Sequence, residues 1–336
     1  SPPAVAREAI GPKKAALRKE PANERVSMST LLITHPCFVA HDTGPGHPER
    51  PDRMRAIDAA LKHDLFKPLL RVEAPLRDDV EETIALAHPR DYIAAIKAAR
   101  PDPGEEPVRL DPDTVLSPGS WEPALRAVGA GLHAVDEVLA GKAKTAFCQV
   151  RPCGHHAEAA RAMGFCIFNN IAIAGLYART KGAERIAVVD FDVHHGNGTQ
   201  DIFQNDARVL YASTHQFPLY PGTGARSETG AGNLVNVPLA PGTASAEFRQ
   251  ACREFLVPAL RGFAPQLVLI SAGFDAHRLD PLANLNLDTE DYRWITEELV
   301  DLARRYAHGR VVSTLEGGYS LTALRQGVAA HVSALL

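Results

Sequence analysis

Short apolar runs alternate along the chain with longer stretches that show the spacing of amphipathic helices. The apolar runs predict strands at residues 30–34, 69–72, 145–150, 185–191, 208–214, 266–273 and 310–317. These runs are continuous rather than alternating, which is typical of strands covered on both faces. Helical spacing falls between them, at residues 120–140, 169–181, 245–262, 288–307 and 319–335. The alternation predicts an α/β fold, a three-layer sandwich with a mainly parallel central sheet.

Polar residues gather at the ends of five of the predicted strands. In chain order the clusters are "RPCGHH", "DFDVHHGNG", "STHQ", "GFDAH" and "EGGY". The carboxyl ends of parallel strands meet at one edge of an open α/β sheet, and ligands bind at that edge. Ordinary solvated loops are the alternative, but they would be richer in Ser, Lys and Glu and poorer in His and Asp. The sequence therefore predicts a functional site at this edge.

Composition and charge exclude some classes of function. The 336 residues are 45% hydrophobic and 23% charged, with a formal net charge of −4, so we expect a globular protein that binds no nucleic acid. No apolar run approaches the roughly 18 residues of a membrane-spanning helix, so we expect no membrane partner. The five cysteines lack a framework spacing, which indicates a reducing, cytoplasmic compartment. A homo-oligomer is left open.

Residues 1–28 differ in composition from the rest of the chain. They are rich in Pro, Ala, Lys and Arg and contain no apolar stretch of signal-peptide length. We therefore expect a flexible N-terminal extension at 1–28. No internal repeat or low-complexity linker divides the remainder, which we expect to be a single catalytic domain over 29–336.

Three residues have the chemistry of a metal site. Asp192 and His194 are two residues apart, so in an extended segment their side chains point to the same side. Asp275 follows another predicted strand and would meet them at the shared edge. Three protein ligands with an open fourth position are typical of catalytic zinc, and nitrogen and carboxylate ligands suit Zn²⁺ or Fe²⁺. Alternatively, Asp192 caps a helix and His194 is an ordinary loop histidine.

Other polar residues at this edge could activate water. His155 and His156 follow a glycine, and a neutral imidazole is the usual base for that purpose. Asp190 and Asn197 are natural partners to orient two imidazoles; an aspartate raises its partner's pKa, whereas an asparagine leaves it closer to neutral. Tyr319 follows two glycines that permit a tight turn, and its phenol could stabilise a developing oxyanion.

Five motifs in this order resemble the zinc-dependent histone deacetylase superfamily: "RPCGHHAEAARAMGFC", "DFDVHHGNGTQ", "YASTHQFPLYPGTG", "SAGFDAHRLDPLANL" and "EGGY". The segment at 41–57, "HDTGPGHPERPDRMRAI", resembles the family's first active-site loop. The resemblance covers residues 29–336 and is strongest to class II-like bacterial histone deacetylase-like amidohydrolases, which are related to acetylpolyamine amidohydrolases. Asn197, where class I members have Asp, is part of that pattern. The resemblance implies the arginase–deacetylase fold.

The resemblance also implies a role for each matching residue. One zinc ion per chain would be held by Asp192, His194 and Asp275. Catalytic roles fall to His156 as general base, His155 as its electrostatic partner, Asp190 and Asn197 as orienting residues, and Tyr319 as the group that polarises the amide carbonyl. The tunnel for the substrate would involve Gly164, Phe165, Tyr220, Leu282, Gly317 and Gly318. A structural potassium site would use Asp190, Asp192, His194, Ser213 and Thr214, mostly through their backbone, and Arg53 would lie near a product channel.

The implied reaction is hydrolysis of an N-acetyl amide to acetate and a free amine by an activated water. The substrate is left open between an acetylated lysine of a protein or peptide and a small acetylated amine such as an acetylpolyamine. Polyamine-specific relatives carry a Glu gatekeeper where this chain has Leu282, which favours acyl-lysine because leucine cannot attract a second ammonium group. A third alternative is a catalytically idle module that binds acyl-lysine. It is less favoured than the two enzymatic alternatives, because every catalytic position of the family has a matching residue in this chain. A two-manganese, arginase-like site would need further bridging carboxylates. This chain instead has His195 and Asn197 after His194, which favours a single catalytic metal.

Two further features have alternative interpretations. The loop at 100–119 holds four acidic residues, which form either an acidic rim for cationic substrates or an ordinary solvated loop: Glu105, Glu106, Asp111 and Asp113. Cys153 stands where the family often has Pro. We hypothesise that it approaches Cys166 and makes the protein sensitive to oxidants; the alternative is an inert small residue.

Overall fold

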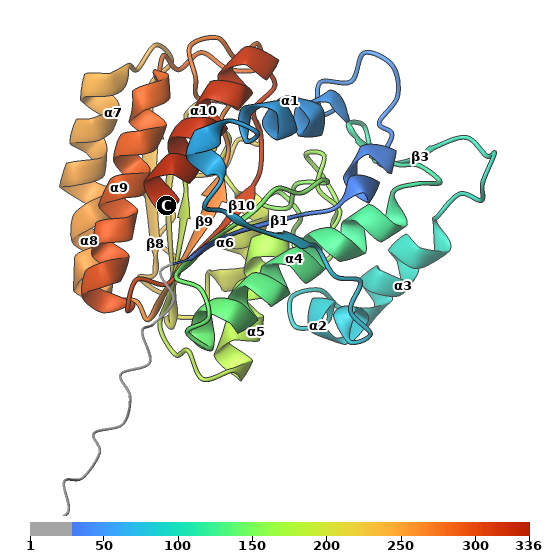
Figure 1. Cartoon of the computed structure of the whole chain (residues 1–336), viewed down its shortest axis with the longest axis horizontal. Helices are drawn as coiled ribbons and strands as arrows, with labels where there is room; N and C mark the ends of the chain where they lie inside the picture. The colour runs from blue at the N-terminus through green and yellow to red at the C-terminus, as the bar shows by residue number, and fades with distance from the viewer. Residues whose placement is uncertain (1–28) are drawn as a thin grey trace, which may run out of the picture.

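An eight-stranded sheet runs through the centre of the computed structural model, which describes residues 29–336 (Figure 1). Its strands, in spatial order, are β2 (Leu70–Glu73), β1 (Thr30–Thr34), β5 (Thr145–Cys148), β10 (Val311–Leu315), β9 (Leu267–Ala272), β6 (Ile186–Asp190), β7 (Val209–Gln216) and β8 (Leu234–Leu239). Every neighbouring pair in this sheet is parallel. The predicted parallel α/β sheet is therefore confirmed, whereas the predicted extension at 1–28 lies outside the described residues.

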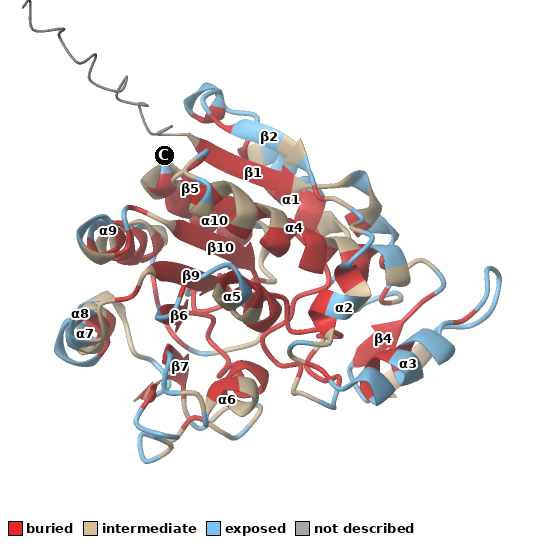
Figure 2. Cartoon of the chain, turned by 90° about the horizontal axis from the view of Figure 1, so that it is seen from below, coloured by how far each residue is buried: buried red, intermediate tan, exposed pale blue. Residues whose placement is uncertain are grey.

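Helices cover both faces of the sheet and form the outer layers of the sandwich (Figures 1 and 2). Parallel crossover connections are right-handed, so connections toward the β8 edge and connections toward the β2 edge carry their helices on opposite faces. The first group contains α4 (Trp121–Leu139), α5 (Asn170–Thr180) and α6 (Asn197–Phe203), which pack in sequence on one another. The second contains α1 (Asp52–Ala60), α7 (Ser245–Ala251), α8 (Val257–Phe263) and α9 (Thr289–Tyr306); the final helix, α10 (Leu321–Leu335), packs against α1 and α9.

The central strands are buried along their whole length and mostly apolar, because helices cover them on both sides. Each residue of β6, "IAVVD", is fully buried, and so are those of β9 and β10 (Figure 2). The register then sets the level at which polar residues begin. Asp190, the last residue of β6, pairs with Ser213 on β7 and with Ser271 on β9. Neighbouring strands therefore change from apolar to polar at one level, along the edge where the sequence predicted a site.

Some elements were not predicted from the sequence. Strand β8 is at the edge of the sheet and contains Pro238, which is tolerated there because an edge strand has unpaired backbone groups. The loop predicted at 100–119 contains an antiparallel hairpin of β3 (Val108–Asp111) and β4 (Thr114–Leu116). The helix predicted at 245–262 is divided by a π-helical segment, η3 (Cys252–Leu256). The smaller remaining elements are η1 (Pro36–Ala40), η2 (Asp64–Phe66), α2 (Val80–Ile84) and α3 (Arg90–Ala98).

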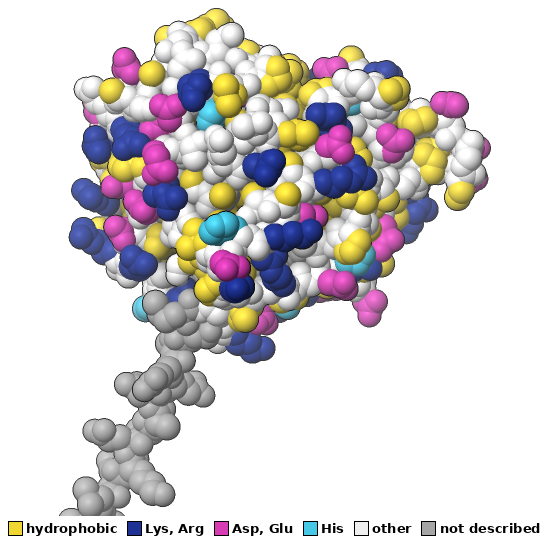
Figure 3. Space-filling model, turned by 45° about the horizontal axis from the view of Figure 1, so that its top comes forward, with side chains coloured by type: hydrophobic (Ala, Val, Ile, Leu, Met, Phe, Trp, Pro, Cys, Tyr) yellow, Lys and Arg dark blue, Asp and Glu magenta, His cyan; other side chains and the backbone are white. Residues whose placement is uncertain are grey.

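The surface is mixed in charge on the face that Figure 3 presents, where basic and acidic side chains are interspersed. Within residues 29–336, no helix combines the length and the apolar character that crossing a membrane requires.

Candidate active site

The predicted metal ligands converge at the carboxyl edge of the sheet. Asp192 and His194 follow β6, Asp275 follows β9, and their donor atoms all lie within 4.8 Å of one another. The Nδ1 atom of His194 is 3.1 Å from Oδ2 of Asp275 and 3.3 Å from Oδ1 of Asp192. Backbone N–H groups hold the two carboxylates: that of Gly317 donates to Asp192 and that of Val193 to Asp275, each over 2.8 Å.

This donor set fits a divalent cation. Burial, followed by the negative charge of Asp192, raises the pKa of Asp275 to about 7. Two buried carboxylates at this separation repel each other, and a cation between them would remove that repulsion. Two carboxylates and one imidazole, without a thiolate, suit Zn²⁺ or Fe²⁺ and leave coordination positions for substrate and water.

The two adjacent histidines have different partners. Nδ1 of His155 lies 2.9 Å from Oδ2 of Asp190, whereas Nδ1 of His156 lies 2.8 Å from Oδ1 of Asn197. Burial opposes a charge on His155, but the carboxylates of Asp190 and Asp192 raise its pKa well above the ordinary value. Burial, with the charges of His155 and His194, lowers the pKa of His156. The pKa values of the two imidazoles, whose ring centroids are 4.1 Å apart, are therefore shifted in opposite directions.

Tyr319 is brought to the site by the loop after β10. Its backbone N–H donates to Oδ2 of Asp280 over 2.8 Å, and its ring meets the ring of Phe165 edge-on with centroids 5.8 Å apart. Gly317 is required for close approach, because a Cβ atom there would lie 2.3 Å from Oδ2 of Asp275 and 2.7 Å from Oδ2 of Asp192. The short "EGG" segment thus runs directly beside the donor set and then turns to present Tyr319.

A cavity of about 230 Å³ joins these groups. It is lined by Asp113, His156, Gly164, Phe165, His194, Tyr220, Leu282 and Tyr319. Of the six residues predicted for the substrate tunnel, four lie on this lining: Gly164, Phe165, Tyr220 and Leu282. Gly317 and Gly318 do not line it and belong to the loop after β10. The four acidic residues of the loop at 100–119 lie in different environments. Asp113 lines the cavity, Asp111 lines an adjoining hollow, and Glu105 and Glu106 are exposed.

A strained turn forms one wall of the cavity. Met163 and Cys166 exchange both backbone hydrogen bonds, of 3.2 and 2.9 Å, across Gly164 and Phe165. Both central residues have positive φ, 58° at Gly164 and 70° at Phe165, which is the conformation of a type I′ turn. A Cβ at Gly164 would lie 2.5 Å from Cδ2 of His156. The turn therefore packs against the imidazole of His156 and directs the Phe165 ring into the cavity.

Sequence reasoning missed a buried ionic network behind Tyr319. Arg53, predicted to lie near a product channel, donates to the carbonyls of Gly318 and Glu316 over 2.7 Å each and to the Glu49 carboxylate over 3.0 Å. Arg151 also donates to Glu49, with the shortest contact 2.8 Å. Although burial opposes ionisation, the charges of Arg151 and Arg53 lower the pKa of Glu49 to about 2. The sequence places Glu49 and Arg53 together in the segment at 41–57, but Arg151 is about a hundred residues away along the chain.

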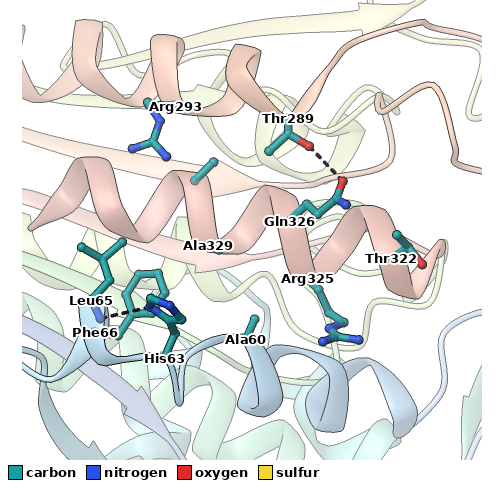
Figure 4. Close-up of a pocket in the computed structure, with 11 residues that line it drawn as sticks. Ala60, His63, Leu65, Phe66, Thr289, Arg293, Thr322, Arg325, Gln326 and Ala329 are labelled. Atoms are coloured by element: carbon teal, nitrogen blue, oxygen red, sulfur yellow. Dashed lines mark hydrogen bonds between the residues drawn. The ribbon is translucent and has the colours of Figure 1, made fainter.

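A larger cavity, of about 570 Å³, lies among α1, η2, α9 and α10 (Figure 4). None of the predicted site residues lines it. Its polar side chains are in part already engaged: Thr289 donates to Gln326, and Arg293 to Glu290 and Ser333. The candidate base, the phenol and a residue of the metal donor set line the smaller cavity instead.

Comparison with known proteins agrees with the motifs. Residues 47–335 match the family model for the histone deacetylase domain. The chain is similar to the histone deacetylase-like amidohydrolase of Pseudomonas aeruginosa, with 40% identity over 290 residues that cover 84% of this chain and 75% of that protein. It is also 37% identical to the human polyamine deacetylase HDAC10 over 328 residues, which cover 92% of this chain and 48% of that protein.

A solved structure shows the same fold. The crystal structure of the HDA15 HD domain superposes with a TM-score of 0.85 at 35% identity, covering 92% of this chain and 88% of that one. The expected arginase–deacetylase fold is thereby confirmed. The chain belongs to the histone deacetylase family and is a hydrolase with the deacetylase or amidohydrolase activity of that family.

Proposed function

We propose that this protein hydrolyses the N-acetyl amide of an acetylated lysine side chain in a peptide or protein, with one zinc ion per chain. The observation that supports this best is the narrow cavity, which is lined by a base, a metal ligand and a phenol at once: His156, His194 and Tyr319. An extended acyl-lysine stem would pass between the rings of Phe165 and Tyr220, which lie on the same lining.

The zinc ligands in this proposal are Asp192, His194 and Asp275. A bound zinc ion would act as a Lewis acid toward the amide carbonyl and toward the attacking water. The N–H groups of Gly317 and Val193 already hold the two carboxylates, so the protein orients its ligands through the backbone of neighbouring loops. We extend the proposal to a structural potassium ion beside the backbone of Asp190, Asp192 and His194 with Ser213 and Thr214, supported by the register of Asp190 with Ser213.

His156 acts as the general base. The Asn197 amide is oriented by its NH₂ group, which donates to Glu158 over 3.0 Å, so its oxygen faces Nδ1 of His156. An amide oxygen only accepts, so Nδ1 carries the hydrogen and the lone pair is on Nε2. This tautomer allows Nε2 to take a proton from water as it attacks the carbonyl carbon.

Tyr319 and the histidine pair complete the reaction. The phenol of Tyr319 donates a hydrogen bond to the carbonyl oxygen as negative charge develops there. The C–N bond then breaks, the leaving amine takes a proton from the histidine pair, and acetate and a free amine are released. Asp190 holds His155 beside His156 throughout.

A small acetylated polyamine is the second candidate substrate. Leu282 on the lining supports acyl-lysine, because it offers no charge to a second ammonium group. Asp113 on the same lining favours the alternative, since a carboxylate at the entrance attracts a cation.

Side-by-side kinetics test this proposal. The kcat/KM of the zinc-loaded protein is measured on acetyl-lysine peptides, N-acetylputrescine and N8-acetylspermidine, with Tyr319→Phe as the catalytic control. We expect a preference for the peptides of about tenfold or more, which corresponds to about 1.4 kcal/mol. A preference for the polyamines would replace the first candidate by the second. Full turnover in Tyr319→Phe would remove the phenol from the mechanism.

A further inference from the structure

Two thiols are in contact beneath the wall of the catalytic cavity. The Sγ atoms of Cys153 and Cys166 are 3.4 Å apart, and both residues are buried. Together with Ala157 they form a small apolar cluster that is separate from the main core. The two residues come from different segments, the loop after β5 and the turn at 163–166. Their contact is a feature of the tertiary structure, not of sequence neighbours.

The thiols also hold the strained turn. The thiol of Cys166 donates to the carbonyl of Gly164 over 3.3 Å, and the thiol of Cys153 faces the same oxygen at 4.0 Å. Gly164 packs on the ring of His156, and Phe165 projects into the cavity. A movement of either sulfur is therefore transmitted to the general base and to the tunnel wall.

Redox chemistry suits this pair better than a second metal ion. The carboxylate of Glu316 lies within 4.8 Å of both sulfurs and would be the third ligand. Its oxygens are already engaged, however, by the N–H groups of Gly154 and His155 and by the hydroxyl of Ser271, at 2.8, 3.1 and 2.9 Å. Two sulfurs in contact, by contrast, need only approach from 3.4 Å to the roughly 2.05 Å of a disulfide.

We propose that Cys153 and Cys166 form an oxidisable dithiol, a modification site at which a peroxide closes a disulfide and lowers the activity of the cavity above. One sulfur attacks hydrogen peroxide, the O–O bond breaks, and a sulfenic acid and water result. The second sulfur attacks the sulfenic sulfur, the S–S bond forms, and a second water leaves. Two thiols and one peroxide thus give one disulfide and two waters, with two electrons passing from sulfur to oxygen.

Closure of this disulfide removes both S–H groups from the carbonyl of Gly164. The turn that carries Gly164 and Phe165 then loses the hydrogen bond that helps hold its positive-φ conformation, and its packing on His156 changes. A displacement of about 1 Å at a catalytic group costs on the order of a hundredfold in rate. We therefore expect oxidation to reduce kcat/KM by about tenfold or more, with recovery on reduction. This effect on rate rests on the proposed function of the cavity, whereas the disulfide itself does not.

The test is peptide mapping of the zinc-loaded protein, combined with kinetics before and after hydrogen peroxide. Trypsin places Cys153 on the peptide 145–161 and Cys166 on 162–179. Cys148 shares the first of these peptides, so fragment ions must assign the sulfur. We expect a cross-linked pair that lacks two hydrogens, an activity loss of about tenfold or more, and recovery of both with dithiothreitol.

Two variants make the result specific. Cys153→Ala removes one member of the pair and should keep its activity after peroxide. Cys148→Ala removes a buried thiol of the same peptide and should respond as the wild-type protein does. Absence of the Cys153–Cys166 cross-link in oxidised wild-type protein, or an equal loss of activity in Cys153→Ala, would overturn the proposal. If neither acetylated substrate is turned over, the cross-link still decides for or against the dithiol.

Discussion

The backbone N–H of Tyr319 donates to the carboxylate of Asp280 over 2.8 Å, so a residue from the loop after β9 positions a residue from the loop after β10. The same carboxylate accepts the N–H groups of Ser320 at 3.3 Å and Leu282 at 2.9 Å. The buried carboxylate of Asp280 therefore fixes the backbone of Tyr319 relative to the backbone of Leu282, a residue of the cavity lining.

Replacing Asp280 should misplace Tyr319 without removing any catalytic group. Asp280→Asn exchanges one accepting oxygen for an NH₂ group, which cannot accept from the backbone. We expect kcat to fall by on the order of tenfold to a hundredfold, with KM and zinc content little changed. Steady-state kinetics check this, with Asp301→Asn, an exposed aspartate of α9, as the matched control. A rise in KM with an unchanged kcat would contradict this positioning role of Asp280.

Adding one methyl group at Gly317 should weaken metal binding. The new Cβ would lie 2.3 Å from an oxygen of Asp275 and 2.7 Å from an oxygen of Asp192, so both carboxylates must move. We expect zinc affinity of Gly317→Ala to fall by on the order of tenfold to a hundredfold, as measured by competition with a chelator. Gly262→Ala, with nothing within 4 Å of its Cβ, should bind zinc as the wild type does. Equal affinities in both variants would speak against this site.

A carboxylate at position 282 should alter the substrate preference. Leu282 lines the cavity, and Leu282→Glu would attract the second ammonium group of an acetylpolyamine. We expect the ratio of kcat/KM for N8-acetylspermidine to that for an acetyl-lysine peptide to rise about tenfold, or about 1.4 kcal/mol. Leu279→Glu places the same charge at an exposed site of the same loop, outside the cavity lining. A similar rise in this control would indicate long-range attraction only.

The stability of the protein should fall in acid through His331. This histidine is fully buried in α10 between the hydroxyls of Thr296 and Ser313, and burial lowers its pKa from 6.5 to about 3. The part of the free energy of unfolding that depends on a neutral His331 is complete above pH 6.5. It is lost as the pH falls toward 3, by about 1.4 kcal/mol per pH unit. Denaturant unfolding at several pH values should give a shallower pH dependence for His331→Gln. Parallel curves for the two proteins would contradict this assignment.

The central strands and the polar clusters after them could be predicted from the sequence because each is a local pattern. Strand β6 is apolar up to its last residue, Asp190, and parallel strands bring such ends together whatever the order of the sheet. The contact of Arg151 with Glu49 spans 102 residues and could not be inferred, since buried charges carry no periodic signal. The position of Asp280 beneath Tyr319 likewise depends on how two loops pack, which local propensity does not determine.

Strand β10 lies between β5 and β9 in the centre of the sheet, although it is the last strand in sequence order. During synthesis on a ribosome, the group β2–β1–β5 and the group β9–β6–β7–β8 therefore have no shared hydrogen-bonded edge until residues 311–315 emerge. Each group meanwhile carries an unpaired strand edge, which is a route to misassociation. Nascent chains that stop short of β10 should therefore be the form of this protein that most needs a chaperone.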